Sequence, residues 1–246
     1  MRCYVHRGPS LEGAQQLSEM DPMLAELRSM HAHRPLWNAL KRTLDIVGSA
    51  ALLVLTSPVF LLAAVLVKLT SPGPVLFRQV RVGYMARPFT MLKFRTMYVD
   101  NDPALHRQYV TDFIKSGGDL QPSERREAPF KIDNDPRTTS IGHLLRRTSM
   151  DELPQLWNVL KGDMSLVGPR PPIAYELEQY RAWHWRRVLE AKPGLTGLWQ
   201  VTGRSSTTFD EMVRLDLRYA RTKSLWLDLK ILLATPRAVI TGRGAR

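Results

Sequence analysis

The sequence predicts a helix-rich α+β protein in which a bent apolar segment precedes a small domain with short strands and amphipathic helices. Three observations lead to this prediction. Residues 46–67 form a run of 22 uncharged residues, about the length that crosses the hydrocarbon of a bilayer. Residues 75–96 hold short apolar clusters with aromatic residues, as short strands do. Residues 175–191 and 225–233 mix apolar with charged residues, as amphipathic helices do.

Residues 1–35 are polar and are predicted to form an N-terminal extension. One short amphipathic helix is expected after Asp21-Pro22, because apolar residues recur there at helical spacing from Met23 to Met30. No apolar stretch of the signal-peptide type occurs in this region, so we expect no cleaved export signal. A loosely attached tail without chemistry is the simplest interpretation.

The uncharged run is interrupted at its centre by Ser57-Pro58. Proline lacks an amide hydrogen, and its ring clashes with the carbonyl four residues earlier, here that of Val54. The segment is therefore predicted to form two apolar half-helices that meet at a bend. Each arm has about 11 residues and a length of roughly 16 Å, which is about half of a hydrocarbon core.

Basic residues flank this run on both sides, with Lys41 and Arg42 before it and Lys68, Arg78 and Arg81 after it. Basic residues near membrane segments favour the cytoplasmic side. A re-entrant helix-break-helix would keep both flanks on that side. A spanning helix with a proline kink and a buried core helix remain alternatives, and cysteine-accessibility labelling of the two flanks separates them.

Residues 36–70 are predicted to form the membrane hairpin, and residues 71–242 are predicted to form one further region. Ser71-Pro72-Gly73-Pro74 ends the helix, and Gly83 marks the turn between the two expected strands. Residues 99–136 are charged and rich in turn-forming residues, so they are interpreted as a polar insertion, a surface loop or a lid.

Three later segments are predicted to be helical. Residues 141–160 form helix with an interruption at Pro154. Residues 175–191 place tryptophans beside arginines, which suits either a membrane-interface helix or a helix packed in the core. Residues 225–233 are fit for lying in the interface and are too short to cross a membrane.

Composition narrows the classes of function. Lysine and arginine number 35 against 23 acidic residues, for a formal net charge of +12. Such a surface suits nucleic acid, anionic lipid headgroups or phosphorylated substrates, and the apolar run favours the last two. No nucleic-acid-binding motif, P-loop, GxGxxG loop or zinc-type spacing of Cys and His occurs. The single cysteine, Cys3, cannot form an internal disulfide.

The densest cluster of chemically useful groups lies between Arg146 and Pro172. Asp151 and Glu152 are adjacent carboxylates, which can hold Mg²⁺ or, in the case of an aspartate, attack phosphorus. Arg146 and Arg170 offer guanidinium forks that match phosphate oxygens. The alternative is that the acidic pair is a solvated helix cap or an ion-paired surface feature.

Several strings in this chain resemble one family. The longest is TSMDELPQLWNVLKGDMSLVGPRP, and the others include KRTLDIVGSAALLVLTSPVFLLAAVLVKLTSPGPVLFRQVRVG, MLKFRTM, DPRTTSIGHLLRRTSMDELPQL, KPGLTGLWQVTGR and LDLRYARTKSLWLDLKIL. In this order they resemble the bacterial sugar transferases, the monotopic phosphoglycosyl transferases that act on polyprenol phosphate. The resemblance covers roughly residues 38–242.

The resemblance implies transfer of a sugar-1-phosphate from a UDP-sugar to undecaprenyl phosphate, with release of UMP. It implies that Asp151 is the nucleophile, and that Glu152 assists with Mg²⁺ or with positioning and deprotonating the acceptor. It implies phosphate-binding roles for Lys93, Arg146, Arg170 and Arg204. Asp216 is a weaker match, and an ion pair with a nearby arginine is its alternative role.

The resemblance also implies a fold and a location. A re-entrant membrane helix broken at Ser57-Pro58 and interfacial helices would hold a small cytosolic catalytic domain at the cytoplasmic face of the bacterial inner membrane. The 99–136 insertion falls in a region that varies across the family, and the N-terminal extension has no recognised counterpart. Membrane lipid is an expected partner, and a homo-oligomer is left open. A non-catalytic membrane-associated scaffold is the alternative, against which the intact Asp151-Glu152 pair argues.

Overall fold

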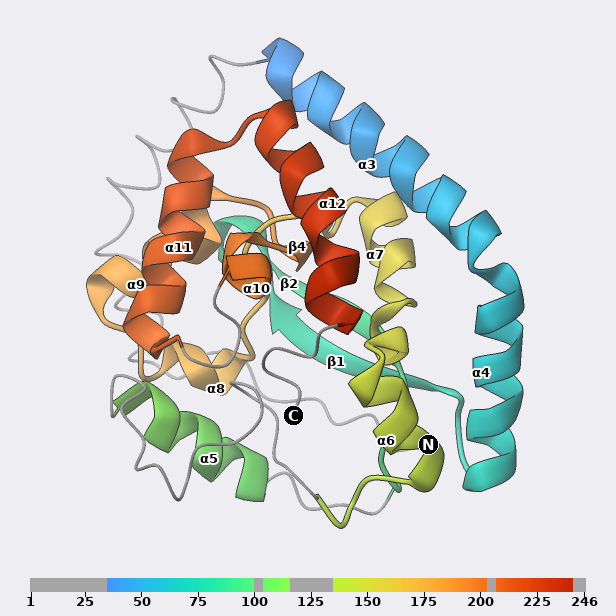
Figure 1. The fold of residues 1–246 in the computed structure, drawn as a ribbon. Coiled ribbons are helices and arrows are strands. Elements are labelled where there is room, and N and C mark those ends of the chain that lie inside the picture. The colour runs from blue at the N-terminus through green and yellow to red at the C-terminus, as the bar shows by residue number, and fades with distance from the viewer. Residues whose placement is uncertain (1–34, 100–103, 116–134, 203–206, 241–246) are drawn as a thin grey trace.

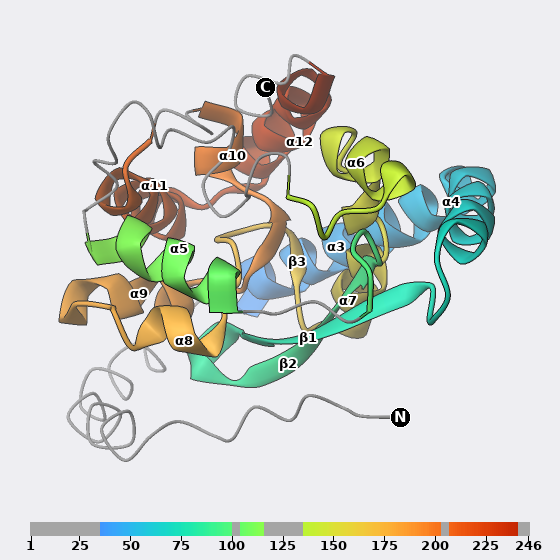
Figure 2. The same cartoon turned by 90° about the horizontal axis from the view of Figure 1, so that it is seen from below.

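The computed structural model describes residues 35–99, 104–115, 135–202 and 207–240. They form a helix-rich α+β fold with two small two-stranded sheets, which confirms the predicted class (Figures 1 and 2). The elements are α3 (Pro35–Leu55), α4 (Ser57–Thr70), β1 (Leu76–Val82), η1 (Tyr84–Ala86), β2 (Pro88–Phe94), α5 (Ala104–Lys115), α6 (Ser140–Arg147), η3 (Met150–Glu152), α7 (Gln155–Lys161), β3 (Ser165–Val167), α8 (Ala174–Leu177), α9 (Ala182–Glu190), β4 (Gly194–Thr196), α10 (Leu198–Thr202), α11 (Phe209–Thr222) and α12 (Leu225–Ile240). The helix expected between Met23 and Met30 and most of the 99–136 insertion lie outside the described residues.

The apolar run bends where the sequence predicts. Helices α3 and α4 meet at Thr56 with an angle of 62° between them, and Pro58 lies in the first turn of α4. The Ser57 hydroxyl donates to the carbonyl of Val54, at 2.8 Å, and the Thr56 hydroxyl donates to that of Leu52, at 2.6 Å. These hydroxyls satisfy carbonyls at the break, so the chain bends without leaving that backbone unpaired.

Among the described residues, no single helix is both long and apolar enough to span a membrane. Helices α3 and α4 pass that test only together, by length and composition. Their outer surface is apolar, and its exposed side chains include Val54, Leu55, Leu61, Leu62, Val65 and Leu69. A bent apolar pair of this kind is compatible with a broken span or with a re-entrant loop.

The first half of α3 is anchored to the rest of the fold. Its Arg42 guanidinium donates to the carbonyls of Val159 and Leu160, each at 2.7 Å, and so caps the C-terminus of α7. The ammonium of Lys41 lies 2.7 Å from Asp228 on α12 and 3.3 Å from Asp45. Asp45 accepts from the hydroxyl of Ser165 and from the amide of Leu166 on β3. Polar groups of α3 therefore meet three separate elements of the domain.

The predicted pair of strands is confirmed as the antiparallel hairpin of β1 and β2, paired from Leu76↔Phe94 to Val82↔Pro88. The turn begins at Gly83, as expected, and continues through η1 to Arg87. A second sheet joins β3 and β4 in parallel, with Ser165 opposite Gly194. This sheet could not be predicted, because each strand has three residues and its partner is not adjacent in the chain.

Part of the 99–136 insertion, which was predicted to be a surface loop or a lid, is instead helical. Residues 104–115 form helix α5, which buries Val110, Phe113 and Ile114 in the core. Those three residues recur at helical spacing, but the charged residues around them concealed the pattern.

The segment at 175–191 divides into the short helix α8 and the helix α9. The core interpretation holds for α9, because His184, Trp185, Arg187, Val188 and Leu189 are all buried. The ring of Trp183 on α9 stays partly exposed. By contrast, α12 leaves Trp226, Leu229 and Leu233 exposed on one face, with Lys230 5.2 Å from the Trp226 ring. That face has the character of an interfacial helix, which stays a prediction.

Candidate active site

The adjacent carboxylates Asp151 and Glu152 lie in a tight turn between two helices. Helix α6 ends at Arg147, Ser149 adopts a left-handed conformation with φ 56°, and η3 carries both acids before α7 begins. A left-handed backbone is uncommon for a residue other than glycine and tends to occur at functional sites. The Asp151 side chain is buried, at 4% exposure, whereas Glu152 is partly exposed. The turn thus places one sheltered and one accessible carboxylate side by side.

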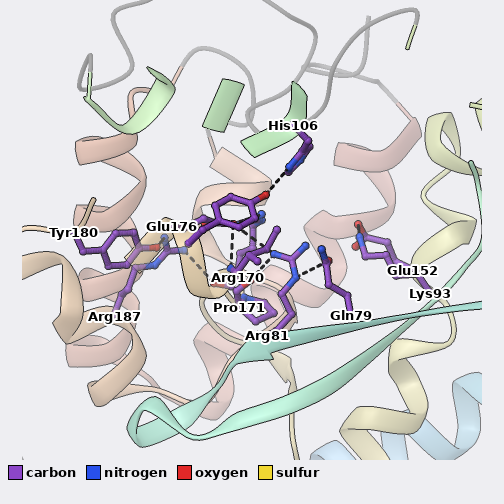
Figure 3. A network of polar contacts seen from close by, with 12 residues as sticks. Gln79, Arg81, Lys93, His106, Glu152, Arg170, Pro171, Glu176, Tyr180 and Arg187 are labelled. Atoms are coloured by element: carbon purple, nitrogen blue, oxygen red, sulfur yellow. Dashed lines mark hydrogen bonds and ion pairs between the residues drawn. The ribbon is translucent and has the colours of Figure 1, made fainter. Parts of the chain in front are cut away.

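Strand β2 brings Lys93 to this turn. Its ammonium donates to Oε1 of Glu152 at 3.0 Å, and the two side chains are 21% and 29% exposed (Figure 3). The structure therefore joins two of the residues that the sequence analysis singled out from positions 59 apart in the chain.

Arg170 follows β3 and is held by a buried carboxylate. Both terminal nitrogens of its guanidinium pair with the two oxygens of Glu176, at 3.0 and 3.1 Å (Figure 3). Burial opposes ionisation of Glu176, but Arg170 and then Arg81 outweigh it and hold the pKa of this carboxyl below its usual value. The bidentate geometry fixes the plane of the Arg170 guanidinium.

Arg81 is a second guanidinium in the same cluster, and the sequence analysis gave it no role at the site. Its Nη1 donates to the carbonyl of Pro171 at 3.0 Å and lies 3.6 Å from Glu176, while its Nε donates to Gln79 at 2.9 Å. Burial, followed by repulsion from Arg170, lowers the pKa of Arg81 to about 10. The signal available in the sequence was alternation, since Gln79 and Arg81 share one face of β1.

One carboxylate thus serves two arginines, and Glu176→Gln tests its importance. We expect this variant to lose about 2 kcal/mol of unfolding free energy, because the buried charge-assisted hydrogen bonds of Arg170 and the ion pair of Arg81 with this carboxylate are lost. Denaturant titration in detergent measures the loss. Glu178→Gln is the matched control, because Glu178 is 49% exposed and pairs with the exposed Arg107. Equal stabilities of the two variants would contradict this assignment.

Arg146 lies in the last turn of α6, one short turn before the acidic pair. Its Nη1 donates to the hydroxyl of Thr138 at 2.9 Å. Thr138 belongs to the loop in which Asp135 pairs with Arg137 at 2.7 Å. The Arg137 hydrogen bond is the largest influence on Asp135, whose pKa lies below its usual value. Arg204, the remaining predicted phosphate ligand, lies outside the described residues.

Asp216 does not lie among the candidate catalytic groups. It forms a buried ion pair with Arg187, at 2.7 Å, which is the alternative role predicted for it from the sequence. Burial raises the pKa of the Asp216 carboxyl to about 6, and Arg187 opposes this rise. Arg187 also donates to Tyr180 at 3.1 Å and to the carbonyl of Arg170 at 3.2 Å. The pair therefore supports the backbone that carries Arg170.

The donor set of the acidic pair suits a hard cation. Within the described ranges, no group of three or more His, Cys, Asp or Glu side chains could hold a metal ion. Mg²⁺ needs fewer protein ligands, since it is commonly held by one or two carboxylates and completed by water and substrate phosphates. Asp151 and Glu152 supply carboxylate oxygens of this kind.

Exposed apolar side chains surround the turn. Leu144 on α6 is 52% exposed, and Met150, immediately before Asp151, is 36% exposed. Large apolar groups left in water beside a charged site often mark a surface that another apolar body covers. The arrangement can accommodate a ligand that is both phosphorylated and lipid-like.

Known proteins share this arrangement of motifs. The profile of the bacterial sugar transferase family matches residues 36–242. The chain is 44% identical over 207 residues to a protein of Streptococcus agalactiae named galactosyl transferase CpsE, with 84% of this chain and 43% of that protein covered. It is 40% identical over 214 residues to the exopolysaccharide production protein ExoY of Rhizobium meliloti, with 87% and 91% covered.

A third relative is named UDP-glucose:undecaprenyl-phosphate glucose-1-phosphate transferase, from Caulobacter vibrioides. It is 44% identical over 208 residues, which cover 82% of this chain and 70% of that protein. The chain spans less than half the length of the streptococcal relative but nearly the whole length of ExoY. The family profile, the identities and the ordered motifs agree, and the chain belongs to the bacterial sugar transferase family.

Proposed function

We propose that this chain transfers a sugar-1-phosphate from a UDP-sugar to undecaprenyl phosphate, giving undecaprenyl-diphosphate sugar and UMP. The names of its relatives specify galactosyl or glucose-1-phosphate transfer, and one specifies exopolysaccharide production. The observation that carries the proposal is the turn at Asp151 and Glu152, with Lys93 3.0 Å from Glu152 and exposed apolar groups beside it. Such a site can receive a soluble diphosphate and a lipid phosphate together.

In the proposed reaction, a carboxylate oxygen of Asp151 attacks the phosphorus that bears the sugar. A bond between Asp151 and phosphorus forms, and the bridging phosphorus–oxygen bond of the diphosphate breaks. UMP leaves with the electron pair of that bond. An oxygen of undecaprenyl phosphate then attacks the same phosphorus and restores the free carboxylate. Splitting one transfer into two steps lets the soluble product leave before the lipid reacts.

Glu152 and Lys93 are assigned to the second step and to charge balance. Glu152 is more exposed than Asp151 and can orient the lipid phosphate or accept its remaining proton. Lys93 pairs with Glu152 and would add positive charge where the phosphates would lie. Arg81 and Arg170 both lie beside the carboxylate of Glu176, and their guanidinium groups can contribute positive charge toward the phosphates.

Asp151 and Glu152 would hold Mg²⁺ together with phosphate oxygens of the donor. When bound, the cation would offset the negative charge that builds up as the diphosphate bond breaks. Arg146 and Arg204 are assigned to the phosphates on the family pattern.

The proposed location follows from the apolar surfaces. In this proposal α3 and α4 re-enter the bilayer and return to the cytoplasmic face, with the break at Ser57-Pro58 as the deepest point. The domain of residues 71–242 would then rest on the inner leaflet through the exposed face of α12. Single cysteines placed at the two flanks, near Arg42 and Lys68, should label from the same side. Labelling from opposite sides would exclude re-entry.

One assay tests the reaction. Full-length protein in detergent is supplied with Mg²⁺, undecaprenyl phosphate and a panel that includes UDP-glucose, UDP-galactose and N-acetylated UDP-sugars, and UMP is measured. With at least one sugar we expect continued UMP release over many turnovers only in the presence of the lipid acceptor. Without the acceptor, the covalent step limits UMP to one equivalent per enzyme. A membrane-associated scaffold would release no UMP with any sugar, so the assay separates the two candidate functions.

Removal of divalent cations provides a second test. We expect EDTA to abolish UMP release and added MgCl₂ to restore it. The two adjacent carboxylates and the diphosphate are all negatively charged, so a cation is needed to bring them together. The control measures the far-ultraviolet circular dichroism spectrum with and without EDTA, which should be unchanged. Full activity in EDTA would remove Mg²⁺ from the proposal.

A further inference from the structure

A groove lined by arginines lies between α9 and α11, which run side by side in Figure 1. Its volume is about 570 Å³, within the range of sites that bind small molecules. The lining includes one acid, Asp210, and five arginines, Arg181, Arg186, Arg214, Arg218 and Arg221. Five guanidinium groups thus face one carboxylate, and none of these residues belongs to the candidate active site.

The single carboxylate of the groove is already engaged. Asp210 pairs with His184 at 3.0 Å and lies 3.6 Å from Arg181. The only other acid in the first turn of α11, Glu211, accepts a hydrogen bond from the amide of Thr208 and caps the helix. Asp210 therefore offsets Arg181, and Glu190 on α9 pairs with Arg186. These acids leave the arginines of α11 itself to be accounted for.

Three arginines of α11 stand out. Arg214, Arg218 and Arg221 recur at intervals of four and three residues, so they project from one face of the helix. All three are exposed, and within the part of the chain that the structure describes none has an ion pair or a side-chain hydrogen bond. Like charges four residues apart destabilise a helix. This spacing of arginines does not stabilise the helix, so folding alone does not explain it.

The lining selects a class of ligand. The cations that line the groove are all arginines, whose planar forks bind phosphate oxygens in pairs. Trp183 and Leu217 add an apolar wall that can contact a base, a sugar or a lipid glycerol. We propose that this groove is a second phosphate-binding site, distinct from the Asp151–Glu152 site.

The groove is connected to the candidate active site by one buried ion pair. Arg187 and Asp216 each lie one residue from a lining residue, and their side chains meet at 2.7 Å. Arg187 also donates to the carbonyl of Arg170. A phosphate ligand that draws α9 and α11 together would therefore act on the segment that carries Arg170.

The phosphate could come from a soluble nucleotide or from a lipid headgroup, and the test has one arm for each source. In the first arm, full-length protein in nonionic detergent with EDTA is titrated with pyrophosphate and with UMP by calorimetry. In the second arm, the protein is floated with phosphatidylcholine vesicles that contain or lack phosphatidylglycerol. The test variant is Arg214→Gln/Arg218→Gln. The control is Lys115→Gln/Lys161→Gln, which removes the same charge from exposed positions on α5 and α7.

We expect the test variant to weaken binding at least tenfold in one arm, while the control stays within twofold of the wild type in both. Loss in the pyrophosphate or UMP arm identifies a soluble ligand, and loss of the phosphatidylglycerol dependence identifies a lipid headgroup. The unfolding temperature of the test variant should equal or exceed that of the wild type, because like-charge repulsion is removed. If the test variant matches the control in both arms, the arginines form an ordinary solvated face and the proposal is wrong.

Discussion

Replacing Asp151 by asparagine is expected to reduce UMP release by at least about a thousandfold, because an amide cannot attack phosphorus in place of a carboxylate. Asparagine is nearly isosteric with aspartate, so the turn at Met150–Glu152 should keep its shape. The measurement is the rate of UMP release with the best UDP-sugar of the panel. In a single-turnover experiment with a donor labelled in the sugar, the wild type should retain label after denaturation and the variant should not.

The matched control for this variant is Asp163→Asn. Asp163 pairs with Lys161 at the surface, and its side chain is 22% exposed. This variant should keep wild-type turnover and wild-type stability. Retention of the wild-type rate by Asp151→Asn would rule out the covalent step, while leaving open a direct transfer between the two substrates at the same site.

Lys41→Met is expected to produce the largest loss of stability. The Lys41 ammonium lies between two buried carboxylates, 2.7 Å from Asp228 and 3.3 Å from Asp45. Removing one partner of a buried ion pair costs about 3–5 kcal/mol, because the remaining charge is left uncompensated. Burial already raises the pKa of Asp228 above its usual value, and Lys41 is the main group that opposes this rise. Denaturant unfolding in detergent, followed by circular dichroism, measures the change.

Lys161→Met provides the comparison for Lys41→Met. Lys161 also lies close to an aspartate, at 3.1 Å, but its side chain is 64% exposed. Exposed pairs contribute only about 0–1 kcal/mol. The double variant Lys41→Met/Asp228→Asn should recover part of the loss, because one of the two carboxylates is then neutral. Similar stabilities of Lys41→Met and Lys161→Met would show that α3 is not anchored through this lysine.

Features that depend on neighbouring residues could be predicted from the sequence. The break at Ser57-Pro58 follows from the missing amide hydrogen and the ring of one proline, and the structure bends the chain there by 62°. The β1–β2 hairpin joins strands that are adjacent in the chain across a turn at Gly83. The sequence also singled out Lys93 and Glu152, which the structure brings to 3.0 Å, although their proximity could not be read from spacing.

Features that depend on distant partners could not be predicted. Glu176 and Arg187 are charged residues in a segment that resembles a surface helix, yet both are fully buried. Buried charges need partners. Arg187 meets Asp216 from α11, and Glu176 meets Arg81 from β1 in addition to the nearby Arg170. The parallel pairing of β3 with β4 could not be predicted either, because a three-residue strand is not recognisable without its partner.

The anchoring of α3 constrains the order of events while the protein is being made. Asp45 leaves the ribosome well before its partner Ser165, which lies 120 residues further along, and Lys41 must wait longer still for Asp228. Throughout that interval the nascent α3 and α4 expose a continuous apolar surface with no domain to cover any part of it. If α3 and α4 enter the bilayer as proposed, lipid provides the earliest surroundings that could shelter them. Membrane association would then come before folding of the domain, and the ion pairs of Lys41 would form last.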